Sequence, residues 1–145
     1  MTEVVAPTTG RFEPPVTEEA EGFWDATRRR ELVLPWCTRC GRAFWYPRPV
    51  CPRCLESHLE WRPASGHGVV YAVSVMHRPA HPGMADRVPY AVALVDLDEG
   101  VRMLSNLVDV DVHAGEAQVG MAVTVTWEPM SDGRHLPVFS PATAT

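Results

Sequence analysis

All four cysteines of the chain lie in two C-x-x-C pairs, Cys37 with Cys40 and Cys51 with Cys54, and ten residues separate the pairs. Each pair can turn its backbone into a knuckle that directs two thiolates at one point, and two facing knuckles form a tetrahedral site of four sulfurs. Gly41 follows the first pair and suits the positive φ that such a turn tends to need. The spacing therefore predicts one structural metal ion held by these four cysteines.

Zinc and iron both fit a site of four sulfurs. The second pair, with a proline inside it, resembles the knuckle of rubredoxins, which hold a redox iron. Iron knuckles of that kind usually carry a glycine after each pair, whereas Leu55 follows the second pair here. Zinc is therefore the favoured cofactor and iron the alternative. Four cysteines close the coordination shell without His58, and a closed shell is structural, because a catalytic zinc keeps one position open.

Short strands and a helix are needed to position the knuckles. Residues 44–46 predict the strand of a hairpin between the two pairs, and residues 32–34 and 58–61 predict strands that enter and leave them. Upstream, Thr17 can cap a helix whose apolar residues share one face. That face needs a partner surface, which is either the rest of this chain or another subunit.

The C-terminal half predicts a small β-barrel. Apolar and β-branched runs predict five strands, at residues 69–77, 90–97, 101–108, 123–127 and 136–139. Five strands suit the OB-fold, whereas a β-sandwich usually needs about seven. The expected fold is therefore mainly β. It comprises an N-terminal arm and helix (1–31), a rubredoxin-like zinc ribbon (32–62) and a five-stranded OB-fold barrel (63–145).

The composition is that of a globular protein, because 46% of the 145 residues are hydrophobic and 21% are charged. No apolar run approaches the roughly 18 residues of a membrane span, and residues 1–10 do not resemble a signal peptide. We therefore expect a cytoplasmic protein that binds no membrane and has reduced thiols, which disfavours two disulfides. The sequence contains no lysine, which excludes a Schiff-base lysine on this chain.

Motifs of catalysis are missing from the sequence. The G-H-G stretch at residues 66–68 lacks the third glycine of a dinucleotide loop, and neither a G-x-S-x-G elbow nor a P-loop occurs. His77 and His81 have the spacing of a zinc-protease helix, but Pro79 between them prevents that helix. We therefore expect no catalytic residue on this chain.

Several segments together resemble one family. They are LPWCTRCGRAFWYPRPVCPRCLESHLEW, SGHGVVYAVSVMH, PYAVALVDLDEGVRMLSNLV, VGMAVTVTW and LPVFSPA. Their ordered combination, which extends over most of residues 23–141, is similar to that of zinc-ribbon/OB-fold proteins associated with acyl-CoA metabolism, a domain of unknown function. The resemblance carries over the four cysteines and no catalytic residue.

Proteins of this family look like partners of thiolase-fold enzymes, including the lipid-transfer-protein-like aldolases of steroid side-chain breakdown and some acyltransferases, or of hotdog-fold hydratases. The resemblance implies a non-catalytic accessory subunit of an acyl-CoA-processing complex, which stabilises its partner and helps form the channel for the CoA thioester. Two copies of each chain would follow the two-fold symmetry of thiolase-fold dimers. Arg42 and Arg48 flank the predicted hairpin and are candidates to bind CoA phosphates.

Seven large aromatic residues crowd residues 23–61, more than a ribbon of this size can bury by itself. Large aromatic side chains left at a surface usually mark an interface. We therefore expect the partner to contact the helix and the ribbon hairpin at Phe23, Trp24, Phe44 and Trp45. The competing interpretation is that the helix folds back and covers these rings within one chain.

Two other functions are compatible with the sequence. An OB-fold can bind single-stranded nucleic acid through a basic groove and stacked aromatic rings. Residues 63–145, however, carry four arginines and nine acidic residues, the wrong balance for phosphate affinity. An iron form of the four-sulfur site could serve as an electron carrier, and a red colour would reveal it.

Overall fold

The computed structural model describes residues 12–142. The N-terminal helix is short, and a 3₁₀ turn, η1 (Glu18–Ala20), leads into α1 (Glu21–Arg28). Thr17 stands before η1 as predicted, but its side chain makes no capping hydrogen bond. Arg28 lies in the last turn of α1, where a cation is favoured by the helix dipole. No helix in this part of the chain is long and apolar enough to cross a membrane.

The ribbon is a three-stranded antiparallel sheet of β1 (Val33–Cys37), β2 (Arg42–Ala43) and β3 (Leu59–Pro63), in the order β2-β1-β3. The strand predicted at residues 44–46 is wrong, because β2 ends at Ala43. Phe44 still donates its N–H to the carbonyl of Pro35 at 3.0 Å, but the chain then leaves the sheet. Pro47 and Pro49 follow at once, and neither can donate to a strand ladder.

The barrel contains five strands, as the sequence predicted. They are β4 (His67–Met76), β5 (Tyr90–Leu97), β6 (Arg102–Leu107), β7 (Ala122–Pro129) and β8 (His135–Pro141). They close in the order β4-β5-β6-β8-β7. The long loop between β4 and β5 carries a 3₁₀ helix, η2 (Pro82–Arg87), which the sequence did not predict.

Gly68 allows β4 and β5 to approach each other closely. A Cβ atom at this position would lie 2.7 Å from the backbone carbonyl oxygen of Asp96 and equally close to the side chain of Val95. Glycine is therefore required here by the neighbouring backbone rather than by its own dihedral angles.

The seam between β6 and β8 is the weakly paired side of the barrel. These strands are parallel and pair at one position, Leu107 with Phe139, whereas β7 and β8 pair along their length. Farther along the seam the hydroxyl of Ser105 donates to the carbonyl of Pro137 at 2.8 Å, so a side chain replaces the backbone ladder there. The outer surface beside this seam is where the groove described below lies.

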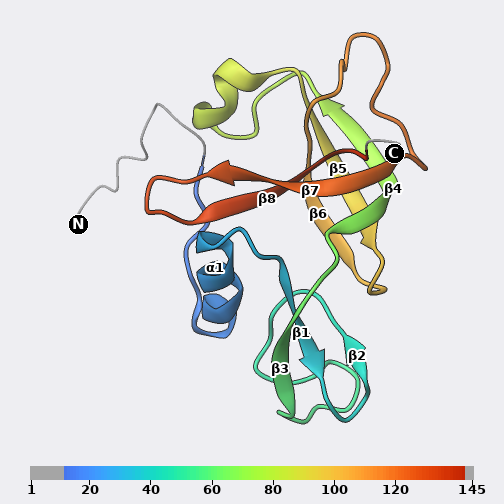
Figure 1. The fold of residues 1–145 in the computed structure, drawn as a ribbon. Helices are drawn as coiled ribbons and strands as arrows, with labels where there is room; N and C mark the ends of the chain where they lie inside the picture. The colour runs from blue at the N-terminus through green and yellow to red at the C-terminus, as the bar shows by residue number, and fades with distance from the viewer. Residues whose placement is uncertain (1–11, 143–145) are drawn as a thin grey trace.

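One apolar core joins the three parts. Figure 1 shows α1 and the ribbon together on one side of the barrel, with α1 next to the β7–β8 hairpin. The core includes residues of the helix, the ribbon and the barrel, among them Phe23, Leu34, Ala43, Val95 and Phe139. The ribbon is therefore packed against the rest of the chain and is not a separate bead.

This packing corrects the expectation that the aromatic rings of the N-terminal half are left at the surface. Phe23, Trp24 and Phe44 are buried within this chain, so the alternative in which the helix folds back describes them correctly. Phe23 packs edge-on against Trp24 and Trp45, with ring centroids 4.9 and 5.0 Å apart. Trp45 is only half-buried, and Tyr46 beside it is exposed.

Candidate metal centre and apolar groove

The four cysteine sulfurs converge at one end of the ribbon. Cys37 is the last residue of β1. Cys40 lies in the turn between β1 and β2, and Cys51 and Cys54 lie in the segment between β2 and β3. The Sγ atoms of Cys37 and Cys54 are 3.7 Å apart, those of Cys40 and Cys51 are 3.9 Å apart, and all four lie within 4.8 Å of one another. Sulfurs placed tetrahedrally about 2.3 Å from a zinc ion are about 3.8 Å apart. The cluster therefore has the size of a zinc site.

The two knuckles have matching backbones. Gly41 donates its N–H to the carbonyl of Cys37, Leu55 donates to that of Cys51, and both distances are 2.9 Å. Gly41 has φ of 66° and Leu55 has φ of 62°. Leucine pays a steric cost of about 1–2 kcal/mol in this region, whereas glycine does not. Leu55 in place of a second glycine therefore raises the conformational free energy of the second knuckle, but the backbone has the same shape.

The thiols also fit a bound cation. Backbone hydrogen bonds, the largest from Cys54 and another from Arg53, lower the pKa of Cys51 to about 6. Desolvation, followed by hydrogen bonds from Cys54 and the other sulfurs, raises the pKa of Cys40 to about 12. Four adjacent sulfurs cannot all be thiolates unless a cation balances their charge. A zinc ion would supply that charge, and its role in this closed site is structural.

Two ribbon arginines make contacts inside the ribbon. Arg39 forms an ion pair with Glu56, which also lies 3.0 Å from Nε2 of His58. The hydrogen bond from Arg39 is the main reason that the pKa of Glu56 is lowered. Arg53 donates to the carbonyl of Ala43 at 3.1 Å. These contacts brace the two knuckles against β2 and the start of β3.

The predicted CoA-binding arginines, Arg42 and Arg48, are both exposed. Arg42 begins β2, whereas Arg48 borders a shallow hollow of about 100 Å³ that Glu19 and Glu60 also line. Neither arginine lines the large groove described next. Their role with CoA phosphates therefore stays a prediction.

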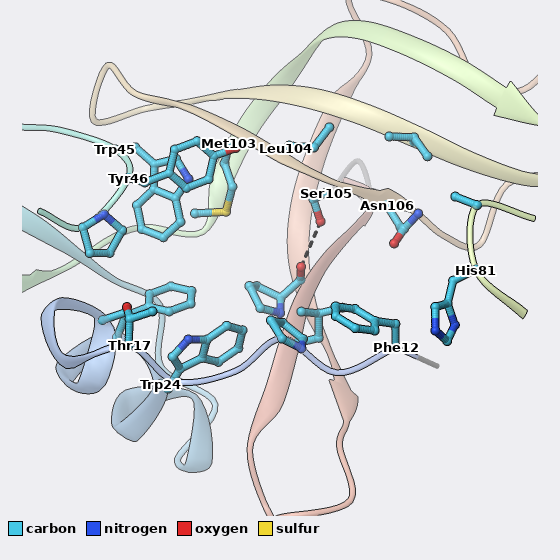
Figure 2. Close-up of a pocket in the computed structure, with 18 of the residues that line it drawn as sticks. Phe12, Thr17, Trp24, Trp45, Tyr46, His81, Met103, Leu104, Ser105 and Asn106 are labelled. Carbon is cyan, nitrogen blue, oxygen red and sulfur yellow. Dashed lines mark hydrogen bonds between the residues drawn. The ribbon is translucent and has the colours of Figure 1, made fainter. Parts of the chain in front are cut away.

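An apolar groove of about 830 Å³ lies where the helix, the ribbon and the barrel meet. Figure 2 shows Trp45 and Tyr46 at one end and Phe12 and His81 at the other. The segment before α1, together with Trp24, forms one side, and β6 forms the opposite side. The residues that line it are Phe12, Pro14, Thr17, Ala20, Phe23, Trp24, Trp45, Tyr46, Pro47, Ala80, His81, Met84, Tyr90, Val92, Met103, Leu104, Ser105, Asn106, Leu136 and Pro137.

Three polar side chains of the groove make structural hydrogen bonds. Nδ1 of His81 accepts the N–H of Gly83 at 3.0 Å, and the amide of Asn106 donates to the carbonyl of Ala91 at 3.1 Å. The hydroxyl of Ser105 donates across the β6–β8 seam. Among the described residues, the lining includes no arginine, aspartate, glutamate or cysteine. The groove can therefore hold an apolar group, but its walls offer no nucleophile paired with a base.

The sequence analysis missed this groove, although the sequence contains a signal of it. An antiparallel strand with one solvated face alternates between apolar and polar residues. In β5 the outward-facing residues Tyr90, Val92 and Leu94 are as apolar as the inward-facing ones and are only partly exposed. An apolar outer face on a barrel strand indicates a surface that another group can cover, and here Tyr90 and Val92 line the groove.

Two family models match the chain in succession. The rubredoxin-like zinc ribbon domain of ChsH2 matches residues 24–60, and the C-terminal OB-fold domain of ChsH2 matches residues 61–128. These matches, together with the four-cysteine cluster and the closed five-stranded barrel, confirm the predicted fold and the structural zinc.

Curated relatives fall into two groups. A DUF35 domain-containing scaffold protein of Methanothermobacter thermautotrophicus is 35% identical, over 81% of this chain and 90% of the relative. A probable enoyl-CoA hydratase alpha subunit of Thermomonospora curvata is 36% identical, over 91% of this chain and 46% of the relative. The 3-oxo-4,17-pregnadiene-20-carboxyl-CoA hydratase alpha subunit of Mycobacterium tuberculosis is 31% identical, over 82% of this chain and 37% of the relative. The chain thus spans less than half the length of these two hydratase subunits.

Solved structures agree with the family models. A chain of the Ltp2-ChsH2(DUF35) aldolase superposes with a TM-score of 0.80 and is 34% identical, covering 90% of this chain and all of the other. A DUF35 family protein of Sulfolobus solfataricus shares the fold, with a TM-score of 0.60 and 15% identity over 86% of each chain. Because it is 35% identical to a DUF35 scaffold protein over 90% of that relative, and because its ribbon and OB-fold both match ChsH2, this chain belongs to the DUF35 family.

Proposed function

We propose that this chain is a non-catalytic accessory subunit of an acyl-CoA-processing complex. The observation that carries the proposal is the apolar groove of about 830 Å³ on the β5–β6 side of the barrel. OB-folds bind their ligands on the corresponding face, formed by their second and third strands. A mainly apolar groove in which the described lining pairs no nucleophile with a base suits the acyl part of a thioester and leaves the chemistry to another chain.

The partner that we propose is a thiolase-fold, lipid-transfer-protein-like aldolase or acyltransferase, with steroid side-chain retro-aldol cleavage as one such reaction. The structural similarity to the Ltp2-ChsH2(DUF35) aldolase supports this choice. The similarity to two hydratase alpha subunits supports a role beside CoA thioesters more generally. Two copies of each chain would follow the two-fold symmetry common in such enzymes.

In this proposal the chain stabilises its partner and completes the channel for the shared acyl-CoA. The acyl part lies along the groove, and Arg42 and Arg48 at the ribbon meet the CoA phosphates. Trp45 is the favoured contact for the partner, because it is only half-buried and stands at the ribbon end of the groove. Phe23, which packs behind Trp45, supports that ring from within the chain.

Co-expression with a thiolase-fold, lipid-transfer-protein-like enzyme of the same organism tests the proposal. We expect one stable complex in sedimentation, aldolase or acyl-transfer activity that requires the partner, and no turnover by this chain alone. Two separate species at micromolar concentration would contradict the proposed complex. Thioester or aldol cleavage by the homogeneous isolated chain would contradict its non-catalytic role.

Substitution of Trp45 tests the proposed contact. Trp45→Ala should weaken the complex about 30-fold, the effect of losing a central aromatic anchor worth about 2 kcal/mol. Trp61→Ala is the matched control, since Trp61 belongs to the same ribbon but does not line the groove. Zinc content is measured on both variants. Loss of zinc from Trp45→Ala would mean that this ring supports the ribbon, and the contact would then have to lie elsewhere.

The nucleic-acid alternative gains no support from the groove. Single strands need a basic track along the backbone as well as aromatic rings for the bases. The groove has the rings, including Trp45 and Tyr46, but none of the residues 12–142 that line it is an arginine, and the chain has no lysine.

A further inference from the structure

Residues 12–17, here called the strap, form one wall of the groove. Phe12, Pro14 and Thr17 all line it, and the strap has neither helical nor strand structure. A segment without regular structure has no hydrogen-bond ladder of its own to fix its position. The wall is therefore only as firm as the contacts between the strap and other elements.

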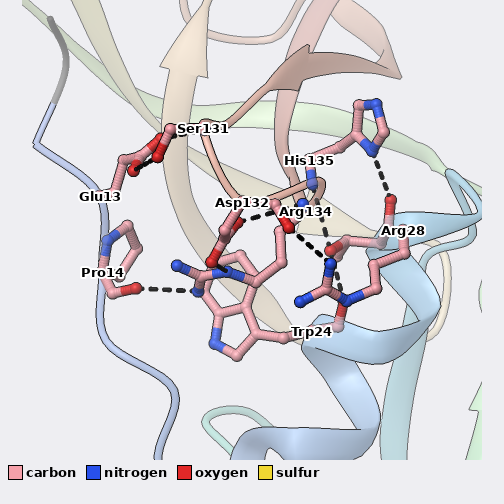
Figure 3. Close-up of polar contacts among 9 residues, drawn as sticks. Glu13, Pro14, Trp24, Arg28, Ser131, Asp132, Arg134 and His135 are labelled. Atoms are coloured by element: carbon pink, nitrogen blue, oxygen red, sulfur yellow. Dashed lines mark hydrogen bonds and ion pairs between the residues drawn. The ribbon is translucent and has the colours of Figure 1, made fainter.

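These contacts involve the turn between β7 and β8, as Figure 3 shows. The carboxylate of Glu13 accepts hydrogen bonds from both the backbone N–H and the hydroxyl of Ser131. The hydrogen bond from the Ser131 side chain is the largest cause of the lowered pKa of Glu13, so this carboxyl stays ionised as an acceptor. The next residue, Pro14, accepts a hydrogen bond from Nη1 of Arg134 at 2.8 Å. We call these contacts the clasp.

Arg134 ties the clasp to Trp24, which lies on the same side of the groove as the strap. Its side chain is almost fully buried, and Nε donates to the carboxylate of Asp132 at 2.7 Å. Its guanidinium group lies 4.8 Å from the ring centroid of Trp24, which itself lines the groove. A buried guanidinium needs its partners, because an unpaired buried charge is costly. The strap at Pro14 and the ring of Trp24 are therefore held by one side chain.

Beyond the clasp, the strap closes one end of the groove with Phe12. The ring of Phe12 is 5.2 Å from that of His81, tilted by 53°. His81 is fixed by the hydrogen bond from Gly83 that caps η2. Phe12, in contrast, is 56% exposed. The end of the groove thus consists of a fixed ring and an exposed ring that rests on it.

We propose that Phe12, resting on His81, is the end wall that sets the length of the straight acyl chain the groove accepts, and that the clasp holds this wall in place. The inference rests on the proposed function, in which the acyl part occupies the groove. Trp45 and Tyr46 stand at the opposite end, close in sequence to Arg48. The thioester would therefore lie toward the ribbon and the tail of the acyl chain toward Phe12.

Saturated fatty acids of increasing length test the end wall. The full chain is titrated with each acid, which displaces 1-anilinonaphthalene-8-sulfonate, and affinity is plotted against the number of carbons. Every methylene that is buried tightens binding about fourfold. We expect this gain to stop at one chain length in the unaltered protein. In Phe12→Ala it should continue for two or more further carbons, which raises the affinity for those longer acids about tenfold or more.

Two further variants separate the wall from the rest of the strap. Val16→Ala is the matched control, because Val16 is an exposed strap residue that does not line the groove, and it should leave the length limit unchanged. Ser131→Ala removes one hydrogen bond of the clasp. The gain in affinity per carbon should then fall off gradually with chain length, and the affinity for short acids should not change. Thermal melting of each variant shows whether it is folded.

Two results would overturn the inference: the same length dependence in Phe12→Ala and in the unaltered chain, or no binding of any acid to either. Complex formation with the thiolase-fold partner is measured on the same preparations. If the complex forms while the length limit does not change, only the end wall is refuted. If the complex fails to form, the proposed function is refuted, whatever the fatty acids do.

Discussion

Four sulfurs lie close together at one end of the ribbon, whereas the centre of the barrel is filled by side chains such as Val95, Val123 and Phe139, which are at most 1% exposed. Strands of five, two and five residues cannot enclose a sufficient apolar core by themselves. Metal binding is therefore expected to supply most of the free energy of folding of the ribbon. The barrel needs no ion, because its strands bury apolar side chains from every side.

This difference has a limit, because the two regions share residues of one core. Leu34 and Ala43 of the ribbon belong to the same apolar cluster as Phe139 of the barrel, with Phe23 of α1 between them. Each of the following substitutions or conditions asks how far damage to one region reaches the other.

Cys51→Ala should have the largest effect. Loss of one thiolate removes the closed zinc site, and structural zinc sites contribute apparent binding free energies of about 10–16 kcal/mol. We expect zinc loss and rapid amide exchange over residues 32–62, with the barrel amides largely protected. Elemental analysis and hydrogen exchange measure the two effects. Thr38→Ala, between two ligands, is the control and should keep its zinc. Stoichiometric iron in the unaltered protein would contradict the zinc assignment.

Phe139→Ala probes the barrel in the same way. Phe139 is fully buried, and truncation of a buried phenylalanine costs about 3–5 kcal/mol through lost burial and the cavity left behind. The barrel should melt at a markedly lower temperature while the ribbon retains its zinc up to that transition. Zinc release well below the barrel transition would show that the ribbon depends on the barrel core more than its metal site suggests.

Gly68→Ala should reduce the free energy of unfolding by an intermediate amount. Gly22→Ala is the comparison, because there the added Cβ meets a side chain and not the backbone. A Cβ at Gly68 meets the backbone carbonyl of Asp96, which cannot move without breaking the β4–β5 pairing, so we expect a loss of about 1–3 kcal/mol. A Cβ at Gly22 meets the indole of Trp61 at 2.2 Å, but that side chain is 37% exposed and can swing away. Helix propensity offsets the remainder by about 1 kcal/mol. Denaturant titration should separate the two variants, and equal losses would refute this distinction.

Acid should have the smallest effect on the barrel. The hydrogen bond from Arg102 is the main reason that the pKa of Asp96 is lowered below its ordinary 3.8. A lowered pKa gives stability that is present above the unfolded pKa and is lost as the pH falls through the folded one. Between pH 5 and pH 2 the unaltered barrel should therefore lose slightly more stability than Asp96→Asn. The effect is small because both side chains are 45% exposed.

Measurement of barrel signals alone keeps this acid experiment clear of the ribbon. Protonation of the thiolates releases zinc, so the ribbon should unfold at a higher pH than the barrel. If barrel stability depends on pH identically in the unaltered protein and in Asp96→Asn, the Asp96–Arg102 pair contributes nothing to folding.

The sequence predicted what depends on spacing and periodicity. The two C-x-x-C pairs define the metal site because ligand positions follow from local turns. The five strands follow from runs of β-branched residues, and the OB-fold follows from their number. These features are local, or are sums of local features, and the structure contains them with small shifts at the ends.

The features that the sequence did not predict depend on contacts between distant residues. Trp24 lies beside Arg134, which comes from the turn between β7 and β8 and also contacts the strap, and neither contact is evident from the neighbours of Trp24 in the sequence. The groove exists only because α1, the ribbon and β6 meet. The strand predicted at residues 44–46 was misplaced, since β2 is Arg42–Ala43 and the ring of Trp45 packs instead against Phe23 of α1.

The three residues between β3 and β4 have a consequence for the molecule as a whole. Ala64 donates its N–H to the residue before β1 at 2.8 Å, Ser65 donates to the carboxylate of Glu99, and Gly66 accepts from Val125 at 2.8 Å. This linker is therefore held by three hydrogen bonds and is rigid. The angle between the two halves is encoded in the chain itself. An inserted residue would change the orientation of the ribbon relative to the barrel. Cleavage here would give two fragments, neither of which contains all the walls of the groove.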